Sequence, residues 1–216
     1  VIRTVPVADH ARAAAIRKEL ERLGEYEVLV FTSAYGVERF FELLLEAGMD
    51  IRHVSHMRFA VIGQGTCEAL GKRGIRADYM PDQYDGASLG RLLAQTLKED
   101  VRILLARSSI GGSEILRELE KNPRLTFTDL AVYDTRFLEG QTARLRSFME
   151  DGSVTKVVFT SSSTVEGFVR MLGAFPYDRV KAVCIGRKTA QTAEKAGMQA
   201  VSARNATLDE IAACVG

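Results

Sequence analysis

The residues of this chain that could do chemistry are mostly hydroxyl side chains that directly follow short apolar runs. Two such turns are Thr32-Ser33, which follows residues 28–31, and Thr160-Ser161-Ser162, which follows residues 157–159. A run of Val, Leu and Phe without alternation is typical of a strand buried on both faces of a parallel sheet. Hydroxyl groups placed where such a strand ends and a helix begins can accept hydrogen bonds from the first amides of the helix.

Three further turns occupy the same kind of position. They are Gly63-Gln64-Gly65-Thr66, Arg107-Ser108-Ser109 and Gly186-Arg187-Lys188-Thr189. In open parallel sheets, ligands bind beyond the carboxyl ends of the strands, where free amides and the positive ends of helix dipoles gather. Each turn alone is also an ordinary capping sequence, but five in equivalent positions predict a site for a ligand that carries several carboxylates.

The sequence lacks the usual signatures of cofactors and catalytic groups. Neither a G-x-G-x-x-G after a strand nor a Walker loop is present, so a nucleotide cofactor is not supported. His53 and His56 form an H-x-x-H pair, but no carboxylate or thiol ligand sits at a helpful spacing, which favours a solvated loop over a metal site. Tyr133 is the polar aromatic residue between the two halves, where it could be a general acid or a buried packing residue.

The elements that must position these residues follow the same order in both halves of the chain. This internal repeat predicts two similar α/β lobes with parallel sheets covered by helices. We expect strands near residues 28, 59, 78 and 101 in the first half, and near 156, 182 and 200 in the second. The predicted domains are a complete lobe over residues 8–128 and a second lobe over residues 138–216, with strands over 1–7 and 129–137 pairing as a bridge.

The second predicted lobe has one strand fewer than the first. A three-stranded sheet with a missing neighbour leaves an unpaired edge. We therefore expect a strand–helix unit of this lobe to stand upstream of residue 1, and a reduced lobe is the alternative.

The net charge, the apolar runs and the cysteine content limit the possible classes of protein and of partner. A net charge of +1 over 216 residues gives no general attraction to nucleic acid or to an acidic membrane. The sequence has no apolar run of membrane-spanning length, and no secretory signal opens it. The three cysteines, Cys67, Cys184 and Cys214, are odd in number and widely spaced, which argues against a disulfide framework and favours a reducing cytoplasm.

Several segments, taken in order, resemble the uroporphyrinogen-III synthase family. They are VLVFTSAYGVERFFELL, FAVIGQGTCEAL, VRILLARSSIGGSEILRELE, AVYDT, VVFTSSSTVEGF and AVCIGRKTAQTAEKAGM. The likeness covers nearly the whole chain, and the order of the motifs is specific. The resemblance implies two flavodoxin-like parallel-sheet lobes joined by a two-stranded antiparallel linker, with a cleft between them. It also implies that the first βα unit of the family belongs to the C-terminal lobe.

The resemblance implies an enzyme that cyclises hydroxymethylbilane, a linear tetrapyrrole with acetate and propionate arms, to uroporphyrinogen III. Loss of the terminal hydroxyl gives an azafulvene, which is attacked by the substituted carbon of ring D. The resulting spiro intermediate reopens and recloses with ring D inverted, whereas uncatalysed closure gives isomer I. The resemblance further implies no metal or organic cofactor, a monomer, and a substrate handed over by hydroxymethylbilane synthase.

The site residues follow from the resemblance and from the strand-end positions. Tyr133 matches the tyrosine of the family's V-Y-x-T motif, which is expected to assist departure of the hydroxyl. The resemblance places six hydroxyl residues in the cleft as substrate contacts: Thr32, Ser33, Thr66, Thr160, Ser161 and Thr189. Their position at strand ends adds Arg107 and Ser162. The alternative hypothesis is a non-catalytic two-lobed module that binds a polycarboxylate and leaves it unchanged.

Overall fold

The computed structural model describes residues 2–138, 140–203 and 208–215 and divides into two compact units. We call residues 4–135 the N-terminal unit and residues 136–216, together with residues 1–3, the C-terminal unit. Both units are built from parallel strands connected by helices, which confirms the predicted α/β class.

The N-terminal unit contains a sheet with the strand order β1-β5-β4-β2-β3. Its strands are β1 (Ile2–Pro6), β2 (Val28–Phe31), β3 (Arg58–Val61), β4 (Val101–Ser108) and β5 (Leu125–Phe137). Its helices are α1 (His10–Glu21), α2 (Ala34–Glu46), α3 (Gln64–Gly71), α4 (Gly86–Thr96) and α5 (Glu114–Leu119). The strands β2 to β5 are parallel, and β1 adds to the sheet beside β5. Both β1 and β5 cross the boundary between the units.

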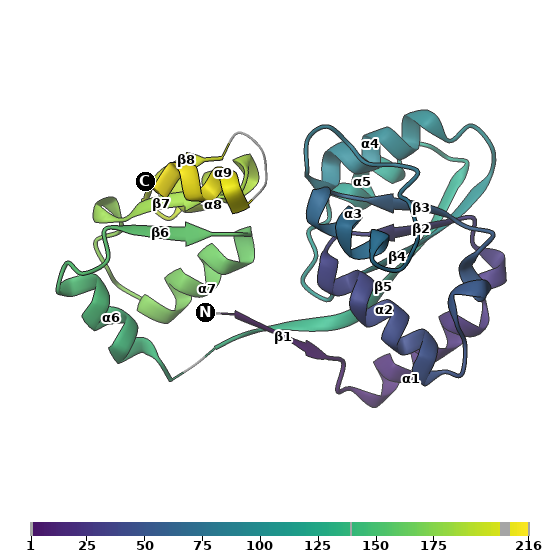
Figure 1. Cartoon of the computed structure of the whole chain (residues 1–216), viewed down its shortest axis with the longest axis horizontal. Coiled ribbons are helices and arrows are strands. Elements are labelled where there is room, and N and C mark those ends of the chain that lie inside the picture. Colours follow the sequence, from purple (N-terminus) through teal and green to yellow (C-terminus); the bar gives the residue numbers. More distant parts are fainter. Residues whose placement is uncertain (1, 139, 204–207, 216) are drawn as a thin grey trace. The chain divides into compact units, whose positions relative to one another are not determined.

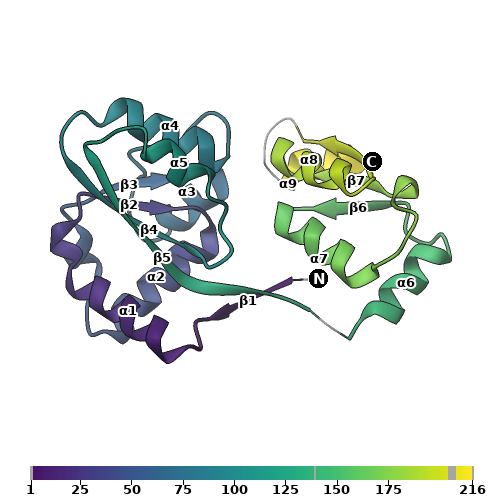
Figure 2. The same ribbon diagram turned by 180° about the vertical axis from the view of Figure 1, so that it is seen from behind.

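Helices cover both faces of this sheet, because the central strands are apolar on both sides. All four residues of β2 are buried, and they alternate between the two core clusters. Leu29 and Phe31 face the layer that holds α1, α2 and α3, whereas Val28 and Val30 face α4 and α5. Figures 1 and 2 show α1 and α2 on one face and α4 and α5 on the other.

Two elements differ from their predictions. The strand expected near residue 78 is a single bridge between Tyr79 and Ala60, because the Asp78 carboxylate takes the amide of Phe59 and Pro81 cannot donate to a ladder. The strand expected over residues 129–137 begins four residues earlier, at Leu125, and its first part is a full parallel partner of β4. Its sequence alternates there because one face carries polar side chains.

The H-x-x-H pair makes ordinary backbone contacts. Asp50 and His53 cap the short 3₁₀ helix Ile51–Val54, and the Asp50 carboxylate accepts a hydrogen bond from the amide of Arg52. The Nε2 atom of His56 lies 3.2 Å from the carbonyl oxygen of Tyr26. His53 thus serves the backbone of its own loop, and His56 meets the backbone of the segment before β2.

The C-terminal unit contains a parallel sheet with the order β6-β7-β8, as the three predicted strands require. Its strands are β6 (Lys156–Phe159), β7 (Lys181–Cys184) and β8 (Gln199–Ser202), and its helices are α6 (Thr142–Glu150), α7 (Ser162–Leu172), α8 (Arg187–Lys195) and α9 (Leu208–Val215). One face packs against α7 and α8 around Phe159, Phe168 and Ala193. On the other face Val158 and Val201 remain 44% and 56% exposed.

Within the described residues, none of the helices combines the length and apolar character that crossing a membrane requires.

The buried thiol of Cys184 gives a test of the C-terminal unit. Its side chain is fully buried in β7, and burial raises the pKa of the thiol to about 11. Because the thiolate is the reactive form, we expect iodoacetamide at pH 8 to label the half-buried Cys67 and Cys214 first. Peptide mapping by mass spectrometry measures the three rates, with urea-unfolded protein as the control. Labelling of Cys184 as fast as Cys67 in the folded protein would contradict this packing.

Candidate active site

Tyr133 stands at the carboxyl end of the β4–β5 ladder, where the register of the two strands changes. Arg107 of β4 pairs with Ala131 of β5, but the next β4 residue, Ser108, pairs with Tyr133. One residue of β5, Val132, is therefore unmatched, which is the arrangement of a β-bulge. A bulge re-aims the side chains that follow it, and the neighbours Val132 and Tyr133 are accordingly both buried. The bulge thus turns the phenol toward the end of the sheet, beside Ser108.

The phenol of Tyr133 is held by hydroxyl groups and by an aromatic ring. Its oxygen lies 2.9 Å from Oγ of Ser33, and Ser108 is the residue opposite Tyr133 on the neighbouring strand β4. Oγ of Ser108 is in turn 2.9 Å from Oγ1 of Thr135. The ring of Tyr35 packs edge-on against the Tyr133 ring, with centroids 4.9 Å apart. Four hydroxyl groups from three segments of the chain therefore form one cluster.

Burial decides the protonation state of this phenol. Tyr133 is 6% exposed, and loss of hydration raises its pKa, while the side-chain hydroxyls of Ser33 and Ser108 act in the opposite direction. The raised pKa keeps the phenol neutral through the physiological range, so that it retains a proton to donate.

The cluster lies where the strand order of the sheet reverses. The chain passes from β2 to β3 on one side of β2, and β4 lies on the other side. Open α/β sheets bind ligands beyond the carboxyl ends of the strands at such a switch point. Ser33 follows β2, and Ser108 ends β4. The hydroxyl cluster therefore occupies the position at which this architecture offers a binding site.

Ser33 serves two structures at once. It is the N-cap of α2, and its Oγ accepts a hydrogen bond from the amide of Gly36 at 3.0 Å. Gly36 brings the first turn of α2 close to β4, because a Cβ there would lie 3.1 Å from the same Oγ and 3.2 Å from the carbonyl oxygen of Ala106. The start of α2 is thus fixed against both β4 and the Tyr133 cluster.

Arg107 is engaged within the protein. Its guanidinium forms two 2.6 Å hydrogen bonds with the Asp129 carboxylate and one with the carbonyl of Gly112, and its side chain is 5% exposed. Gly111 leaves room for this group, because a Cβ there would lie 2.5 Å from Nη1. A substrate carboxylate would have to displace these partners. The arrangement therefore fits a brace for the loop after β4 better than a direct contact with a ligand.

The other predicted binding residues lie at strand ends and helix starts within their own units. Thr32 is half-buried beside Ser33, and Thr66 is buried in the first turn of α3. In the C-terminal unit, Ser161 caps α7 and accepts from the amide of Thr164 at 3.2 Å, and Ser162 receives a hydrogen bond from Thr192 at 3.0 Å. Thr160 is exposed at the end of β6, and Thr189 is buried in the first turn of α8. Their binding role stays a prediction.

Sequence reasoning does not single out two members of the cluster. It places Ser108 only in the loop after its strand, and Thr135 only as the last letter of the V-Y-x-T motif. Thr135 lies two residues from Tyr133 on the same strand, a spacing that puts alternate side chains on one face of a regular strand. This spacing could have indicated from the sequence that Thr135 lies on the same face of the strand as Tyr133. The approach of Ser108 depends on the bulge, which the sequence does not display.

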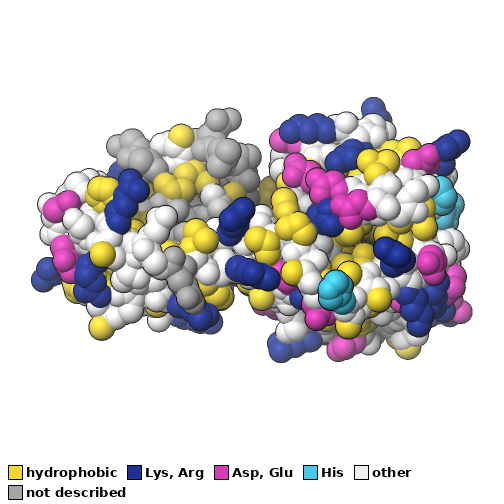
Figure 3. Space-filling model, turned by 90° about the horizontal axis from the view of Figure 1, so that it is seen from below, with side chains coloured by type: hydrophobic (Ala, Val, Ile, Leu, Met, Phe, Trp, Pro, Cys, Tyr) yellow, Lys and Arg dark blue, Asp and Glu magenta, His cyan; other side chains and the backbone are white. Residues whose placement is uncertain are grey.

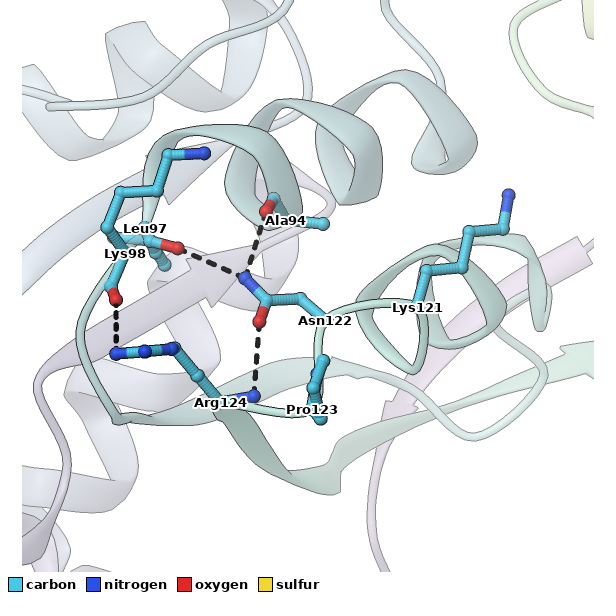
Figure 4. A pocket seen from close by; sticks show the side chains of 7 residues that line it. All are labelled: Ala94, Leu97, Lys98, Lys121, Asn122, Pro123 and Arg124. Atoms are coloured by element: carbon cyan, nitrogen blue, oxygen red, sulfur yellow. Dashed lines mark hydrogen bonds between the residues drawn. The ribbon is translucent and has the colours of Figure 1, made fainter.

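A surface hollow of about 440 Å³ lies elsewhere in the N-terminal unit, beside the beginning of β5. Figure 4 shows Asn122 in its wall, with the side-chain amide donating to the carbonyls of Ala94 and Leu97 at the end of α4. Arg124 donates to the carbonyl of Lys98 in the same way. These polar groups complete the carboxyl end of a helix, so the hollow is accounted for by the local structure.

Charges of both signs are interspersed on the face of the N-terminal unit that Figure 3 shows. This distribution agrees with the net charge of +1. On the viewed face, the basic side chains do not merge into the kind of extended stripe that follows a nucleic-acid backbone.

Comparison with known proteins places the chain in a single family. A family profile described as "Uroporphyrinogen-III synthase HemD" matches residues 1–213. A porphyrin biosynthesis protein HemD of Ruminiclostridium josui is 29% identical over 210 residues, and the chain spans 41% of the length of that relative. A uroporphyrinogen-III synthase of Synechococcus elongatus is 26% identical over 195 residues, which are 87% of this chain and 73% of the relative.

Solved structures share the fold. A mutant uroporphyrinogen III synthase from the extreme thermophile Thermus thermophilus has a TM-score of 0.70 at 19% identity, covering 100% of this chain and 85% of that chain. A uroporphyrinogen-III synthetase from Helicobacter pylori has a TM-score of 0.62 at 14% identity, covering 100% of this chain and 89% of that chain. At these identities the likeness establishes the fold alone.

The brace formed by Arg107 can be tested by its contribution to stability. Arg107→Met leaves the Asp129 carboxylate and the Gly112 carbonyl without their donor, and we expect a loss of about 2 kcal/mol in the free energy of unfolding. Arg102→Met, on the same strand, removes only an exposed ion pair with Glu25 and should cost less than about 1 kcal/mol. Urea unfolding with comparable m-values measures both. Equal losses for the two variants would show that Arg107 does not brace the loop.

The close approach at Gly36 gives a second stability test. Gly-to-Ala changes in helices usually stabilise by up to about 1 kcal/mol, but Gly36→Ala should destabilise by roughly 1–3 kcal/mol, because the Ala106 carbonyl and Ser33 must give way. Gly65→Ala, in the first turn of α3, meets nothing within 4 Å and should be neutral or stabilising. Thermal unfolding compares the two. A stabilised Gly36→Ala protein would contradict the tight contact.

Proposed function

Because the chain belongs to the uroporphyrinogen-III synthase family, we propose that it cyclises hydroxymethylbilane to uroporphyrinogen III, with inversion of ring D and release of water. This activity is that of a lyase in porphyrin biosynthesis. The observation that carries the proposal is the family match over residues 1–213, combined with a neutral, buried tyrosine at the switch point of the sheet.

In this proposal Tyr133 assists departure of the terminal hydroxyl. A poor leaving group such as hydroxide departs more easily when a positioned acid gives it a proton. The phenol of Tyr133 is suited to this step, because burial raises its pKa and holds it in the neutral form. The enzyme's further task is to hold the reactive chain so that closure through the spiro intermediate is faster than direct closure to isomer I.

The carboxylate arms of the substrate would meet helix N-termini. The starts of α2 and α3 follow β2 and β3, and both present amides and a positive dipole end beyond the strands. Thr32 and Thr66 belong to these turns. A part for Thr160, Ser161, Ser162 and Thr189 in binding rests on the repeated sequence pattern, in which they match the turns of the first half. We assign Arg107 a positioning role, because its guanidinium is already bonded to Asp129.

Further features of the proposal concern the protein as a whole. We propose that β1 and the last part of β5 serve as the linker between two flavodoxin-like lobes over residues 8–128 and 138–216. We also keep the expectations of a monomer in the cytoplasm and of hand-over of the substrate from hydroxymethylbilane synthase, on the strength of the family resemblance. Each of these rests on analogy with the family.

The activity is tested by incubating the protein with freshly prepared hydroxymethylbilane and separating the products by chromatography after oxidation. We expect uroporphyrinogen III in excess of isomer I. Isomer I alone, formed at the uncatalysed rate, would refute the proposal. Recovery of unchanged substrate bound to the protein would instead support the polycarboxylate-binding alternative.

The part of Tyr133 is tested by Tyr133→Phe, which removes only the hydroxyl. We expect kcat to fall by at least about tenfold, because the effect of a positioned acid is typically larger than this. Tyr177→Phe is the matched control, because its phenol also donates in a partly buried site, to the carbonyls of Val169 and Gly173, but far from Tyr133 in the chain. A similar kcat for Tyr133→Phe and wild type would exclude the phenol as the acid.

A further inference from the structure

We propose that Ser33 and Ser108 are positioning residues that act through Tyr133, holding its phenol between two hydroxyl groups and stabilising the phenolate that remains after proton transfer. The inference rests on the proposed function and deepens it, since Ser33 then acts on the phenol instead of binding a carboxylate arm. It also adds Ser108, which lies at the end of β4, to the residues that serve the reaction.

The hydrogen bonds around Ser33 leave its hydroxyl proton available to the phenol. The amide of Gly36 can only donate, so it occupies a lone pair of the Ser33 oxygen. The hydroxyl proton of Ser33 is then free to point at the phenol oxygen 2.9 Å away. With Ser33 donating to it, Tyr133 does not need to spend its own proton on Ser33. That proton is left for the substrate.

Ser108 holds the phenol from the neighbouring strand. The bulge brings Ser108 opposite Tyr133, and the Thr135 hydroxyl lies 2.9 Å from Oγ of Ser108. The Thr135 hydroxyl can donate to the oxygen of Ser108. The Ser108 hydroxyl can then donate toward the phenol. Both serine hydroxyls act to lower the pKa of the phenol, against the larger effect of burial, and so favour the ionised form.

The helix adds a fixed positive field at the same place. Ser33 caps α2, which is thirteen residues long, and the first-turn amide of Gly36 polarises its hydroxyl. A hydroxyl whose oxygen accepts from an amide is a better donor, because hydrogen bonds in a chain strengthen one another. Negative charge on the phenol oxygen is therefore met by a preorganised donor as it develops.

The proton balance of the step is complete. The O–H bond of Tyr133 breaks, its proton goes to the terminal hydroxyl of the substrate, and the electron pair of that O–H bond stays on the phenolate. The C–O bond of the substrate then breaks and water leaves with the electron pair. The first carbon–carbon bond, to the substituted carbon of ring D, releases no proton. After the spiro intermediate reopens, the final bond forms at the unsubstituted α-carbon of ring D, and the α-proton released there restores the phenol of Tyr133.

A double-mutant cycle tests the inference on the intact chain. We expect Ser33→Ala and Ser108→Ala each to lower kcat about three- to tenfold with little change in KM. In the Tyr133→Phe background the same changes should lower kcat by less than twofold, because the group through which they act is gone. Ser33→Thr keeps a hydroxyl and a cap, and it should restore most of the turnover.

Asp85→Ala is the matched control for loss of a cap. Asp85 caps α4 in the same unit and accepts from the amide of Ser88 at 2.7 Å, but it is not part of the Tyr133 cluster. We expect it to lower the thermal stability about as much as Ser33→Ala while leaving kcat unchanged. Ser108 caps no helix, so Ser108→Ala keeps the test open if Ser33→Ala folds poorly.

Three outcomes would overturn the inference. A raised KM with unchanged kcat in Ser33→Ala would make Ser33 a direct substrate contact. If each serine change lowers kcat by the same factor in the Tyr133→Phe background as in the wild type, the serines act independently of the phenol. A wild-type protein that forms only isomer I would remove the proposed function and the inference together, whereas isomer III with multiplied losses removes the inference alone.

Discussion

The contact between Tyr133 and its hydroxyl partners depends on the register shift between β4 and β5. Without this shift, Ser108 would lie opposite Val132 instead of Tyr133. A bulge interrupts the regular hydrogen bonding of the ladder, and here it determines where the side chain of Tyr133 points. The remaining features of the cluster follow from it: the hydrogen bond to Ser33, the edge-on Tyr35 ring and the shielding that keeps the phenol neutral.

The two capping serines show how the same local sequence serves different ends. Ser33 and Ser161 follow equivalent apolar strands, and each caps the next helix through its side chain. The Oγ of Ser161 lies near the hydroxyls of Ser163 and Thr164, whereas the Oγ of Ser33 meets a phenol one hundred residues away in the chain. The duplicated motif therefore supplies a helix start in both units, and the chemistry depends on what the rest of each unit places beside it.

Much of the fold could be read from the sequence, and the limits have physical causes. The apolar strands at residues 28–31 and 181–184 and the helix caps were predictable, because they depend on neighbours in the chain. Tyr79 was predicted to lie in a strand, but the Asp78 carboxylate competes for the backbone donor and leaves a single bridge. The bond from Arg107 to Asp129 and the approach of Ser108 to Tyr133 join residues more than twenty positions apart, and no local pattern encodes them.

The strand β5 carries a consequence for how this chain can vary. It continues without a break from Leu125 to Phe137, and the boundary between the units falls between residues 135 and 136, only two residues after Tyr133. Interdomain connections usually absorb extra residues, because a loop closes at small entropic cost. Here, one added residue would move every later side chain of the strand to the opposite face of the sheet. Homologous chains should therefore vary in length almost anywhere except along this one strand, which sets the spacing between the phenol and the unit boundary.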